Sequence, residues 1–420
     1  MPLLFDSGRV LYHTALRLLA PWHPKAKAWV SGRAGLWERL AAKQDALRGC
    51  IWMHCASVGE FEQGRPVLEA LKQERPDIPV LLTFFSPSGY EARKHEPLAT
   101  HVDYLPPDSS AHARRFLELT APRMAVFVKY EFWYHHLQAA HRRGIPTFLI
   151  AALFRPQQPF FRWYGRDWRR MLGFFTAIGT QDEASKELLD GIGRAHAQVT
   201  GDTRYDRVLR IRDTGAELPL VEAFRGNAPT LVLGSTWPAD EEVVLPAVVD
   251  RPFKLIIAPH ELGAERLDQL EHRLPKPLVR WSELEGMSAH NVADTLGRME
   301  RGTLLVDRMG LLARLYAYGD ICYVGGGFGD GIHNLLEAAV WDRPVFFGPR
   351  HEKFPEAESL RSVGGGWPVN DRADVAAVLA AWAGGAARIA GRRAGGAVRD
   401  GAGATANTMA MLREFGSSRS

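Results

Sequence analysis

Short apolar runs alternate with helical patterns along the chain, and this alternation constrains the fold more than any other feature. In the first half the predicted strands are Ile51–Cys55, Val80–Thr83, Met124–Lys129, Thr147–Ala151, Ala177–Thr180 and Gln198–Thr200. In the second half they are Thr230–Leu233, Lys254–Ala258, Gly302–Val306, Ile321–Val324 and Pro344–Gly348. Strands that alternate with helices indicate parallel sheets covered on both faces, so we predict an α/β protein with doubly wound, Rossmann-like domains.

The length and spacing of these runs predict two domains in tandem. A chain of 420 residues exceeds what one typical hydrophobic core serves. Residues 212–229, which include the loop-like Gly226–Pro229, predict a linker between an N-terminal domain at 51–211 and a C-terminal domain at 230–395. Residues 396–420 are expected to hold a last helix at Ala406–Phe415. Ligands should bind in a cleft between the carboxyl ends of the two sheets.

The first 50 residues are basic and partly amphipathic. They contain eight Lys or Arg and three acids, a net charge of +5, which leaves −1 for the other 370 residues of a chain with net charge +4. From Val10 to Ala20, apolar residues occupy one helical side and basic residues run down the other. Trp22 and Trp29, with two lysines between them, suit a membrane interface. No uncharged apolar run reaches the ~18–20 residues that a spanning helix needs.

Residues 1–50 are therefore interpreted as a segment that joins the N-terminal domain and lies on an anionic membrane surface. A plain surface helix packed on that domain is the alternative. The local basic patch is not a general nucleic-acid surface, so we expect no nucleic-acid partner. Three cysteines (Cys50, Cys55 and Cys322) form no CxxC pair, which favours a reducing, cytosol-facing compartment.

A glycine-crowded turn follows the apolar run Ile321–Val324. The segment Gly325–Glu337 is predicted to lead directly into a helix, whose N-terminus would attract phosphate while the glycines let the backbone approach a ligand. Asn334 and Glu337 are three residues apart, so they should share a helical face, and a carboxylate there suits a ribose diol. Neither GxGxxG nor the P-loop pattern fits this segment. A nucleotide-binding loop and an ordinary strand-to-helix turn both stay open.

Glu60 is a candidate general base in the loop after the first predicted strand. It lies three residues after Ser57, where a helix begins. Its carboxylate has a reference pKa near ~4.3, and the helix N-terminus should keep it ionised at neutral pH. A helix-capping role is the alternative. His54 and Cys55 are interpreted as core residues, because no metal-ligand spacing accompanies them.

Three further loops after strands carry charged or imidazole groups. Glu131 precedes two large aromatic residues, so its burial calls for a cation such as Lys129 or a distant arginine. Arg204 offers a fixed positive charge to a phosphate or carboxylate, or else forms a structural salt bridge. His260 is a weak single-residue signal, and residues 307–311 could supply backbone contacts. No metal cluster is recognisable, so any nucleotide chemistry should work without a divalent ion.

Taken together and in this order, the loops resemble the 3-deoxy-D-manno-octulosonic acid (Kdo) transferases of lipopolysaccharide synthesis. The resemblance covers essentially the whole chain. Besides the basic N-terminus, the matching segments are His54–Glu60, Lys129–Trp133, Leu153–Gln158, Trp163–Gly165, Gly201–Asp206, Gly234–Pro238, Pro259–His260, Met309–Gly310, Gly325–Glu337, Gly348–Pro349 and Lys353–Phe354. The chain departs from the more familiar form at Arg204, which replaces Lys, and at Tyr134, which replaces Pro.

The resemblance implies a GT-B fold in which the N-terminal domain binds the acceptor and the C-terminal domain binds CMP-Kdo. It implies inverting, metal-independent transfer of Kdo to the glucosamine disaccharide of a lipid A precursor, lipid IVA, at the cytoplasmic face of the bacterial inner membrane, with no cofactor. By position in the motifs, Glu60 is the implied base, and Glu131 and Arg204 are the implied transition-state stabilisers. The implied CMP contacts are Pro259, His260, Met309, Gly310, Leu311, Asn334, Leu335, Leu336 and Glu337.

In such folds the final helix crosses back to the first domain, which residues 396–420 suit. Two other functions remain alternatives to Kdo transfer. One is another GT-B enzyme, such as a UDP-sugar transferase or 2-epimerase. The other is a non-catalytic membrane-bound scaffold, which would need no ionisable carboxylate at position 60.

Overall fold

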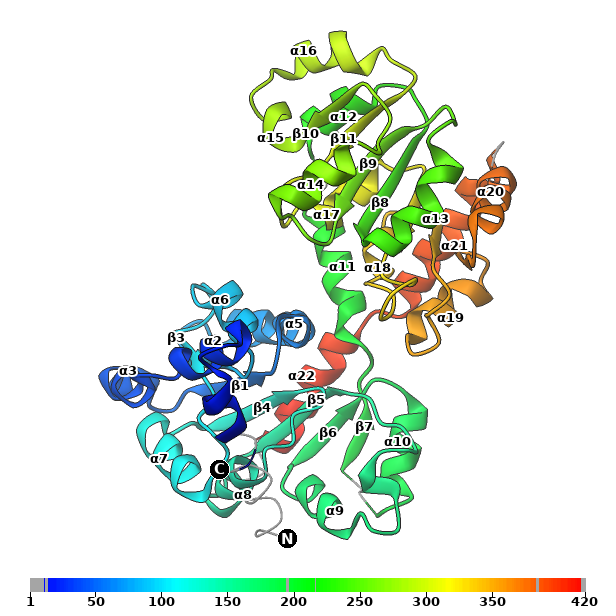
Figure 1. Ribbon diagram of the computed structural model, residues 1–420. Coiled ribbons are helices and arrows are strands. Elements are labelled where there is room, and N and C mark those ends of the chain that lie inside the picture. The colour runs from blue at the N-terminus through cyan, green and yellow to red at the C-terminus, as the bar shows by residue number, and fades with distance from the viewer. Residues whose placement is uncertain (1–10, 12–13, 194–195, 216, 383–384, 417–420) are drawn as a thin grey trace. The chain divides into compact units, whose positions relative to one another are not determined.

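The computed structural model describes residues 11, 14–193, 196–215, 217–382 and 385–416, and it divides into two compact units (Figure 1). The first unit is built from the chain up to residue 207 and from residue 402 onward, and the second from residues 208–401. Each unit contains one seven-stranded parallel sheet with helices packed against it. The predicted α/β, doubly wound class is confirmed.

The strand orders are β3-β2-β1-β4-β5-β6-β7 in the first sheet and β10-β11-β9-β8-β12-β13-β14 in the second. The first sheet consists of β1 (Ile51–Cys55), β2 (Val80–Phe84), β3 (His101–Tyr104), β4 (Met124–Val128), β5 (Thr147–Ala152), β6 (Ala177–Thr180) and β7 (Ala197–Val199). The second consists of β8 (Thr230–Thr236), β9 (Lys254–Pro259), β10 (Leu278–Arg280), β11 (Gly302–Leu305), β12 (Ile321–Val324), β13 (Val345–Phe347) and β14 (Gly366–Pro368).

The helices lie between the strands in chain order. In the first unit they are α2 (Pro24–Gly32), α3 (Leu36–Ala42), α4 (Gln44–Leu47), α5 (Val58–Glu74), α6 (Pro87–Arg93), α7 (Ser110–Thr120), α8 (Tyr134–Arg142), η1 (Pro159–Phe161), α9 (Arg166–Leu172), α10 (Glu183–Asp190) and α22 (Ala404–Gly416). Helix α11 (Thr203–Asp213) spans the division between the units. The second unit has α12 (Pro219–Arg225), α13 (Pro238–Val248), α14 (Ala264–Glu271), α15 (Trp281–Leu284), α16 (Ala289–Val292), η2 (Ala293–Gly297), α17 (Leu312–Leu315), η3 (Tyr316–Tyr318), α18 (Leu336–Ala339), α19 (Pro355–Ser362), α20 (Arg372–Ala381) and α21 (Ala386–Asp400).

Successive residues of β1 pack into different cores on the two faces of the first sheet. Ile51, Met53 and Cys55 belong to one buried cluster, and Trp52 belongs to the other. All five residues of the strand are buried. Burial on both faces explains why the strands of this sheet read as continuous apolar runs instead of alternating apolar and polar residues.

Residues 24–50 contribute to the core of the first unit, to which the segment 1–50 was predicted to be joined. Leu36 and Leu40 are buried in one of the two clusters on this sheet, and Trp29 is only 7% exposed. Arg39 forms a salt bridge of 2.7 Å with the buried Asp103. One of the predicted interfacial tryptophans and one of the predicted surface charges are therefore used inside the protein, because they stabilise its fold.

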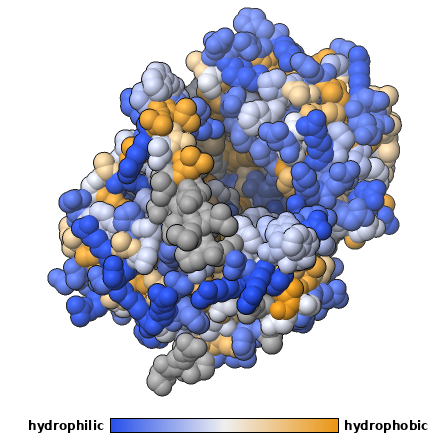
Figure 2. All heavy atoms as spheres, turned by 60° about the horizontal axis from the view of Figure 1, so that its bottom comes forward, coloured by the Kyte–Doolittle hydropathy of each residue, from blue (hydrophilic) through white to orange (hydrophobic). Residues whose placement is uncertain are grey.

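The predicted helix from Val10 to Ala20 lies partly outside the described residues. Within the described part, residues 14–19 are helical, and Leu18 and Leu19 are exposed, as is Trp22 at 82%. Figure 2 shows one face of the molecule, on which the hydrophobic residues drawn in colour form small groups separated by hydrophilic ones. In the part of the chain that the structure covers, no single helix is both long and apolar enough to cross a bilayer.

The last helix, α22, packs on the first unit. Met409, Met411 and Leu412 are buried in the same cluster as the β1 residues Ile51 and Met53. The carboxylate of Asp206 accepts hydrogen bonds from the amides of Gly403 (2.7 Å) and Thr405 (2.5 Å), which satisfies donors at the start of this helix. The chain therefore ends on the unit in which it began.

The boundaries of the units differ from those predicted. The division falls between residues 207 and 208, four residues before the predicted boundary at residue 211, and both positions lie within α11. The predicted linker 212–229 contains α12, whose Val221 and Phe224 are buried, so it belongs to the second unit. Residues 396–400 complete α21, and the returning segment begins only at residue 402.

Candidate functional site

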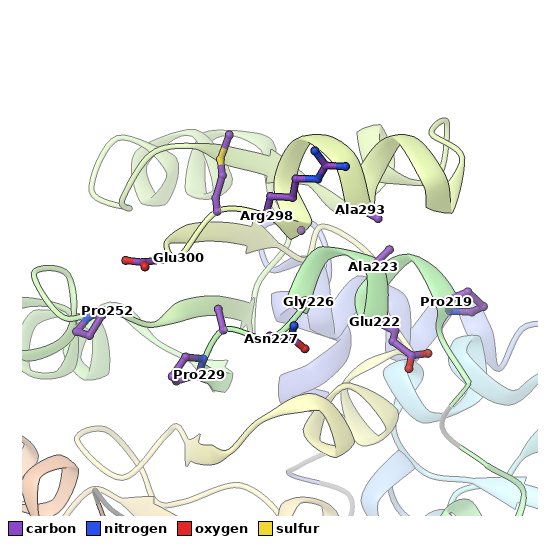
Figure 3. Close-up of a pocket in the computed structure, with 13 residues that line it drawn as sticks. Pro219, Glu222, Ala223, Gly226, Asn227, Pro229, Pro252, Ala293, Arg298 and Glu300 are labelled. Carbon is purple, nitrogen blue, oxygen red and sulfur yellow. The ribbon is translucent and has the colours of Figure 1, made fainter.

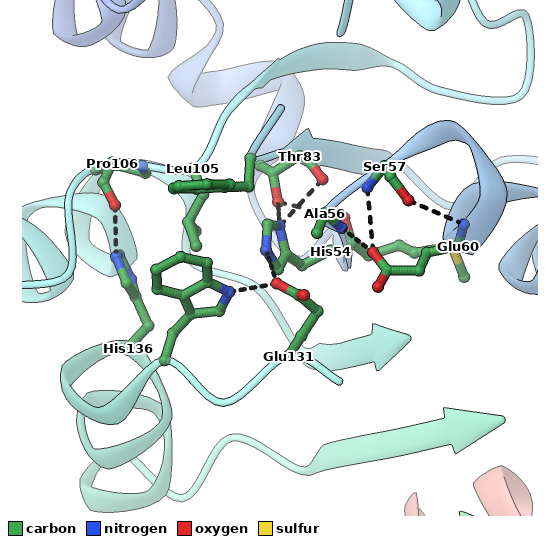
Figure 4. Close-up of polar contacts among 12 residues, drawn as sticks. His54, Ala56, Ser57, Glu60, Thr83, Leu105, Pro106, Glu131 and His136 are labelled. Atoms are coloured by element: carbon green, nitrogen blue, oxygen red, sulfur yellow. Dashed lines mark hydrogen bonds and ion pairs between the residues drawn. The ribbon is translucent and has the colours of Figure 1, made fainter. Parts of the chain in front are cut away.

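Glu60 and Glu131 follow neighbouring strands of the first sheet. Strand β1 lies between β2 and β4, so the chain order changes direction beside it. Glu60 lies in the first turn of α5, after β1, and Glu131 lies in the loop after β4 (Figure 4). Open α/β sheets bind ligands outside the carboxyl ends of their strands at such a switch point. The structure thus brings together two residues that the sequence placed in separate motifs.

Main-chain amides at the start of α5 hold Glu60. Its Oε2 atom accepts hydrogen bonds from the amides of Ala56 (2.5 Å) and Ser57 (3.1 Å), and Ser57 Oγ accepts one from the Glu60 amide (3.4 Å). This reciprocal arrangement is a capping box. Glu60 therefore does cap its helix, and the same bonds fix its carboxylate at the carboxyl end of β1.

Burial and, after it, the negative charge of Glu131 raise the pKa of Glu60 to about 7. The amides of Ala56 and Ser57 and the charge of Lys129 lower this pKa by smaller amounts. The expectation of a fully ionised Glu60 at neutral pH is wrong, because desolvation outweighs the helix N-terminus. A carboxyl group with a pKa close to neutral is well matched to general-base chemistry near pH 7.

Glu131 is buried and bonded to His54, which the sequence analysis assigned to core packing alone. Glu131 Oε2 lies 2.9 Å from His54 Nε2 and accepts a hydrogen bond of 2.5 Å from Trp133 Nε1. The Glu131 side chain is 6% exposed and His54 is fully buried. A carboxylate at this depth is stabilised by these donors, which replace its lost hydration.

Arg204 lies in the first turn of α11, which packs against α5. Thr203 Oγ1 donates a hydrogen bond of 2.5 Å to the carbonyl oxygen of Gln63 in α5. The Arg204 guanidinium donates from Nε (2.9 Å) and Nη2 (2.7 Å) to Asp202 Oδ2, so the structural salt bridge is confirmed. Arg204 and Glu60 both act electrostatically on Tyr130, and they therefore lie in one neighbourhood of the first unit.

Three stacked rings occupy the carboxyl edge of the second sheet. Trp237 follows β8, His260 follows β9, and His333 lies in the loop after β12. The His260 ring stacks on both of the others, with centroids 4.4 Å from Trp237 and 4.6 Å from His333. Trp237 Nε1 donates to His333 Nε2 at 3.0 Å, which places the proton of a neutral His333 on Nδ1. Burial lowers the pKa of His333 and supports its neutral form.

Buried Asp240 holds the glycine-rich loop that the sequence analysis singled out. Its carboxylate accepts hydrogen bonds from the amides of Trp237 and Gly326, both at 2.8 Å, and from the hydroxyl of Tyr323 at 2.7 Å. The amide of Phe328 makes a longer bond of 3.4 Å to the same carboxylate. The amides of Gly326 and Phe328 are therefore bonded to the protein itself and are not free to bind a phosphate.

The glycines of this loop allow close packing between main chains. A side chain at Gly325 would collide with the carbonyl oxygen of Ser235, and one at Gly327 would collide with Gly348. Gly326 adopts a φ of 94°, in the region that favours glycine. The loop approaches the neighbouring backbone, and not primarily a ligand, at these positions.

The predicted nucleotide contacts after the loop are of two kinds: Asn334 caps a helix, whereas Leu335 and Leu336 are core residues. Helix α18 begins at Leu336, so Asn334 precedes it instead of lying within it. Asn334 Oδ1 accepts from the amide of Leu336, and Asn334 Nδ2 donates to Glu337 Oε1, both at 3.2 Å. The side chains of Leu335 and Leu336 are buried, so only their main-chain atoms are available to a ligand.

The remaining predicted contacts share the same edge of the sheet, because β11 lies beside β9. Pro259 ends β9, and the exposed His260 follows it directly. After β11, Met309 is 75% exposed and Gly310 has a φ of 86°, whereas the side chain of Leu311 is 9% exposed. The nine predicted contacts thus come from the end of β9, from the loops after β9, β11 and β12, and from the start of α18.

A separate cavity of about 890 Å³ lies at the opposite, amino-terminal edge of the second sheet (Figure 3). Its lining includes Pro229, just before β8, and Pro252, just before β9. Next to it, the buried Lys254 donates from Nζ to three carbonyl oxygens, those of Phe224 (2.5 Å), Leu296 (2.8 Å) and Gly297 (3.1 Å). Burial lowers the pKa of Lys254 to about 8. This edge is a structural anchor for α12 and η2, and none of the predicted site residues lines the cavity.

Four residues of structural importance were absent from the predicted site: His54, Trp237, Asp240 and His333. The sequence contains a local indication of the role of Asp240, because an acid three residues after the N-cap of a helix commonly bonds the N-cap amide, here that of Trp237. The other three depend on contacts between loops that are distant in sequence. Among the described residues, no group of three or more His, Cys, Asp or Glu is arranged to hold a metal ion.

Comparison with known proteins identifies relatives for most of the chain. The family model for 3-deoxy-D-manno-octulosonic-acid transferase matches residues 31–207. The transferase of that name from Chlamydophila psittaci is 30% identical over 334 residues, which are 75% of this chain and 73% of the relative. The one from Bordetella pertussis is 28% identical over 392 residues, 83% of this chain and 85% of the relative.

A solved structure supports the architecture. The UDP-GlcNAc 2-epimerase from Neisseria meningitidis, bound to UDP-GlcNAc, has a TM-score of 0.57 over 87% of this chain and 99% of its own, at 14% identity. At that identity the likeness shows the fold alone, and the two tandem doubly wound units are a GT-B fold. The sequence relatives show the activity class as well: this chain is a glycosyltransferase that belongs to the 3-deoxy-D-manno-octulosonic acid transferase family.

Proposed function

We propose that the enzyme transfers Kdo from CMP-Kdo to the glucosamine disaccharide of a lipid A precursor, lipid IVA, with inversion and without a metal ion or other cofactor. The observation that carries this proposal is the Glu60 carboxyl group. It lies at the switch point of the first sheet, and burial and the charge of Glu131 raise its pKa to about 7. Such a group can accept a proton from a sugar hydroxyl near neutral pH.

In the proposed step, the acceptor hydroxyl oxygen forms a bond to the anomeric carbon of Kdo. The bond between that carbon and the phosphate oxygen of CMP breaks, and its electron pair leaves with CMP. The hydroxyl proton passes to the carboxylate of Glu60. Glu131, which is fixed by His54 and Trp133, supplies negative charge that favours the positive charge developing on the sugar ring. Arg204, steadied by Asp202, is the proposed cation for the same transition state.

The second unit is the proposed donor site. Trp237 and His333 are hydrogen-bonded to each other, so both rings cover the same face of the His260 ring. The nitrogen atoms of the exposed His260 ring are suited to hydrogen bonds with phosphate or carboxylate oxygens. Glu337 is the proposed partner of the ribose hydroxyls, beside Asn334.

The proposed location is the cytoplasmic face of the bacterial inner membrane. Lys25 and Lys27 are exposed beside the exposed Trp22, and Leu18 and Leu19 are exposed in the preceding helical stretch. Cations and apolar groups on one short segment suit an anionic membrane surface. A lipid acceptor would be reached from such a surface without leaving the bilayer.

A product assay tests the proposed function. Purified enzyme is incubated with CMP-Kdo and a tetraacyl glucosamine-disaccharide lipid, with and without EDTA, and products are analysed by mass spectrometry. We expect a mass increase of one or more Kdo units that EDTA does not abolish. The Glu60→Gln variant should lose at least about a hundredfold in kcat, because the amide cannot accept the proton, while CMP still protects it against thermal unfolding.

Nucleotide preference separates Kdo transfer from the alternatives. Thermal unfolding should shift upward with CMP and not with UDP, since the proposed donor carries cytidine. A shift with UDP alone would favour a UDP-sugar enzyme, and no shift with either nucleotide would favour a scaffold. If this enzyme forms no product while a reference transferase assayed in parallel is active, the proposed function is wrong.

A further inference from the structure

His54 lies at the centre of the first sheet, in the strand that leads to Glu60. It is the fourth residue of β1 and pairs with Thr83 of β2 on one side and with Phe127 of β4 on the other. Its side chain is fully buried, and its ring lies 5.7 Å from Phe127 and 6.0 Å from Trp133, measured between centroids. A substrate therefore has no access to the imidazole, which excludes His54 as a nucleophile or a direct acid or base.

Both ring nitrogens of His54 have fixed partners (Figure 4). Nδ1 lies 2.9 Å from Thr83 Oγ1 and 3.1 Å from the Thr83 carbonyl oxygen, while Nε2 lies 2.9 Å from Glu131 Oε2. Thr83 Oγ1 in turn accepts a hydrogen bond of 2.8 Å from Trp52 Nε1. The imidazole is thus bonded at both ends, and the chain of bonds ends on one oxygen of Glu131.

The two donors to Glu131 converge on the same oxygen. His54 Nε2 and Trp133 Nε1 both bond to Oε2, so neither of these bonds uses Oε1. Trp133 comes from the same loop as Glu131, whereas His54 belongs to a central strand. The bond between His54 and Glu131 therefore ties this carboxylate to the central strand β1.

We propose that His54 is a positioning residue, which holds the Glu131 carboxylate in place beside Glu60. This inference rests on the proposed function, because it assigns Glu131 a part in the transfer step. An ionised Glu131 repels charge on Glu60 and thereby keeps that group ready to take up a proton. Outer partners that orient a reactive group commonly matter tenfold or more for activity.

Two amide substitutions separate this role from simple packing. The side-chain amide of glutamine in His54→Gln can reach the place of Nε2 and donate to Glu131. The shorter amide in His54→Asn can reach only the place of Nδ1 and bond to Thr83. We expect His54→Asn to lower kcat at least about tenfold, with KM for CMP-Kdo within about twofold of wild type, and His54→Gln to restore most of the loss.

His136 provides a matched control. It is fully buried in the same unit, its Nε2 bonds to the carbonyl oxygen of Pro106 at 3.1 Å, and it touches neither Glu60 nor Glu131 in Figure 4. His136→Gln should therefore leave kcat unchanged if it folds, which a thermal unfolding curve verifies for every variant. Equal kcat losses in His54→Asn and His54→Gln, or full activity in His54→Asn, would overturn the inference.

A second measurement does not depend on Kdo transfer. The pKa of Glu60 is read from the ¹³C signal of its side chain in wild type and in both His54 variants. His54→Asn should lower this pKa, because a Glu131 carboxylate without its bond to β1 can move away from Glu60 and repel it less, while His54→Gln should leave it near the wild-type value. An unchanged pKa in His54→Asn contradicts the inference, whereas an inactive wild type with the expected pKa pattern contradicts only the proposed function.

Discussion

Glu60 and Glu131 are two carboxyl groups in one neighbourhood of the first unit, and different partners hold them. Glu131 is bonded to His54 and Trp133. Glu60 accepts main-chain bonds, but burial and the charge of Glu131 dominate and raise its pKa to about 7.

The pH dependence of the reaction follows from this pair. A base works in its ionised form, so kcat/KM should rise with pH and level off above about pH 7, where Glu60 is deprotonated. Glu131→Gln removes the negative charge that raises the Glu60 pKa, so the rise should move to lower pH. The pKa of Glu60 in this variant should stay above the range of an ordinary glutamate, since the Glu60 side chain remains buried. The measurement is kcat/KM across pH 5–9 for wild type and for Glu131→Gln.

Glu131→Asp serves as the control for that measurement, because it keeps the charge while it moves the carboxylate. The pH at which kcat/KM rises in Glu131→Asp should stay near the wild-type value, even if the rate of this variant is low. A rise at the same pH in Glu131→Gln and in wild type would show that Glu131 does not influence the ionisation of Glu60.

At the scale of elements, the glycine-rich loop owes its shape to a residue on another element. Asp240 of α13 bonds the amides of Gly326 and Phe328 and the hydroxyl of Tyr323. The sequence shows the glycines but not this carboxylate, because 85 residues separate Asp240 from Gly325. The sequence therefore left a ligand-binding loop possible, although the structure uses the amides of Gly326 and Phe328 within the protein.

Asp240→Ala should destabilise the second unit by at least about 3 kcal/mol, because it leaves several buried donors without an acceptor. The measurement is the free energy of unfolding in urea. Stabilisation by CMP should also be lost, since Trp237 and the loop that carries His333 both depend on Asp240. Glu242→Ala, an exposed position on the same helix, is the control and should behave like wild type. An unaltered unfolding midpoint in Asp240→Ala would contradict the role assigned to this carboxylate.

The strands that the sequence did not predict are β3, β10 and β14. All three are edge strands, with a partner on one side only. They are short and contain polar residues, glycine or proline, such as Asp103, Arg280 and Gly366. An edge strand needs less apolar sequence than a central one, so its pattern is weak. Ten of the eleven predicted strands are central in their sheets, where burial on both faces demands apolar residues, and the eleventh, β7, is an edge strand.

At the scale of the whole molecule, the basic start of the chain has two roles that the sequence could not separate. Trp29 and Arg39 are used in the first unit, whereas Trp22, Lys25 and Lys27 are exposed. Only the exposed groups are available to a membrane. A high local density of Lys and Arg is thus partly structural, which composition alone does not reveal.

Membrane binding should depend on the exposed part of this segment. Reversal of both charges in Lys25→Glu/Lys27→Glu should weaken binding to liposomes that contain anionic lipid by roughly tenfold or more, at about 1 kcal/mol per cation near the surface. Binding is measured by co-sedimentation at several salt concentrations, with neutral liposomes for comparison. Arg372→Glu/Arg388→Glu makes the same charge change on exposed residues of the second unit and should have little effect. Equal losses in both double variants would point to net charge instead of a local membrane contact.

The sequence by itself determined the α/β class, the two parallel sheets, most of their strands and the loops that carry Glu60, Glu131 and His260, because burial on two faces and strand–loop–helix order leave local patterns. Only the tertiary structure decided the state of these groups. The pKa of Glu60 depends on its burial and on Glu131, 71 positions away, and the place of the Glu131 carboxylate depends on its bond to His54 of β1. Distances between side chains set electrostatic energies, and the linear order of residues does not contain them.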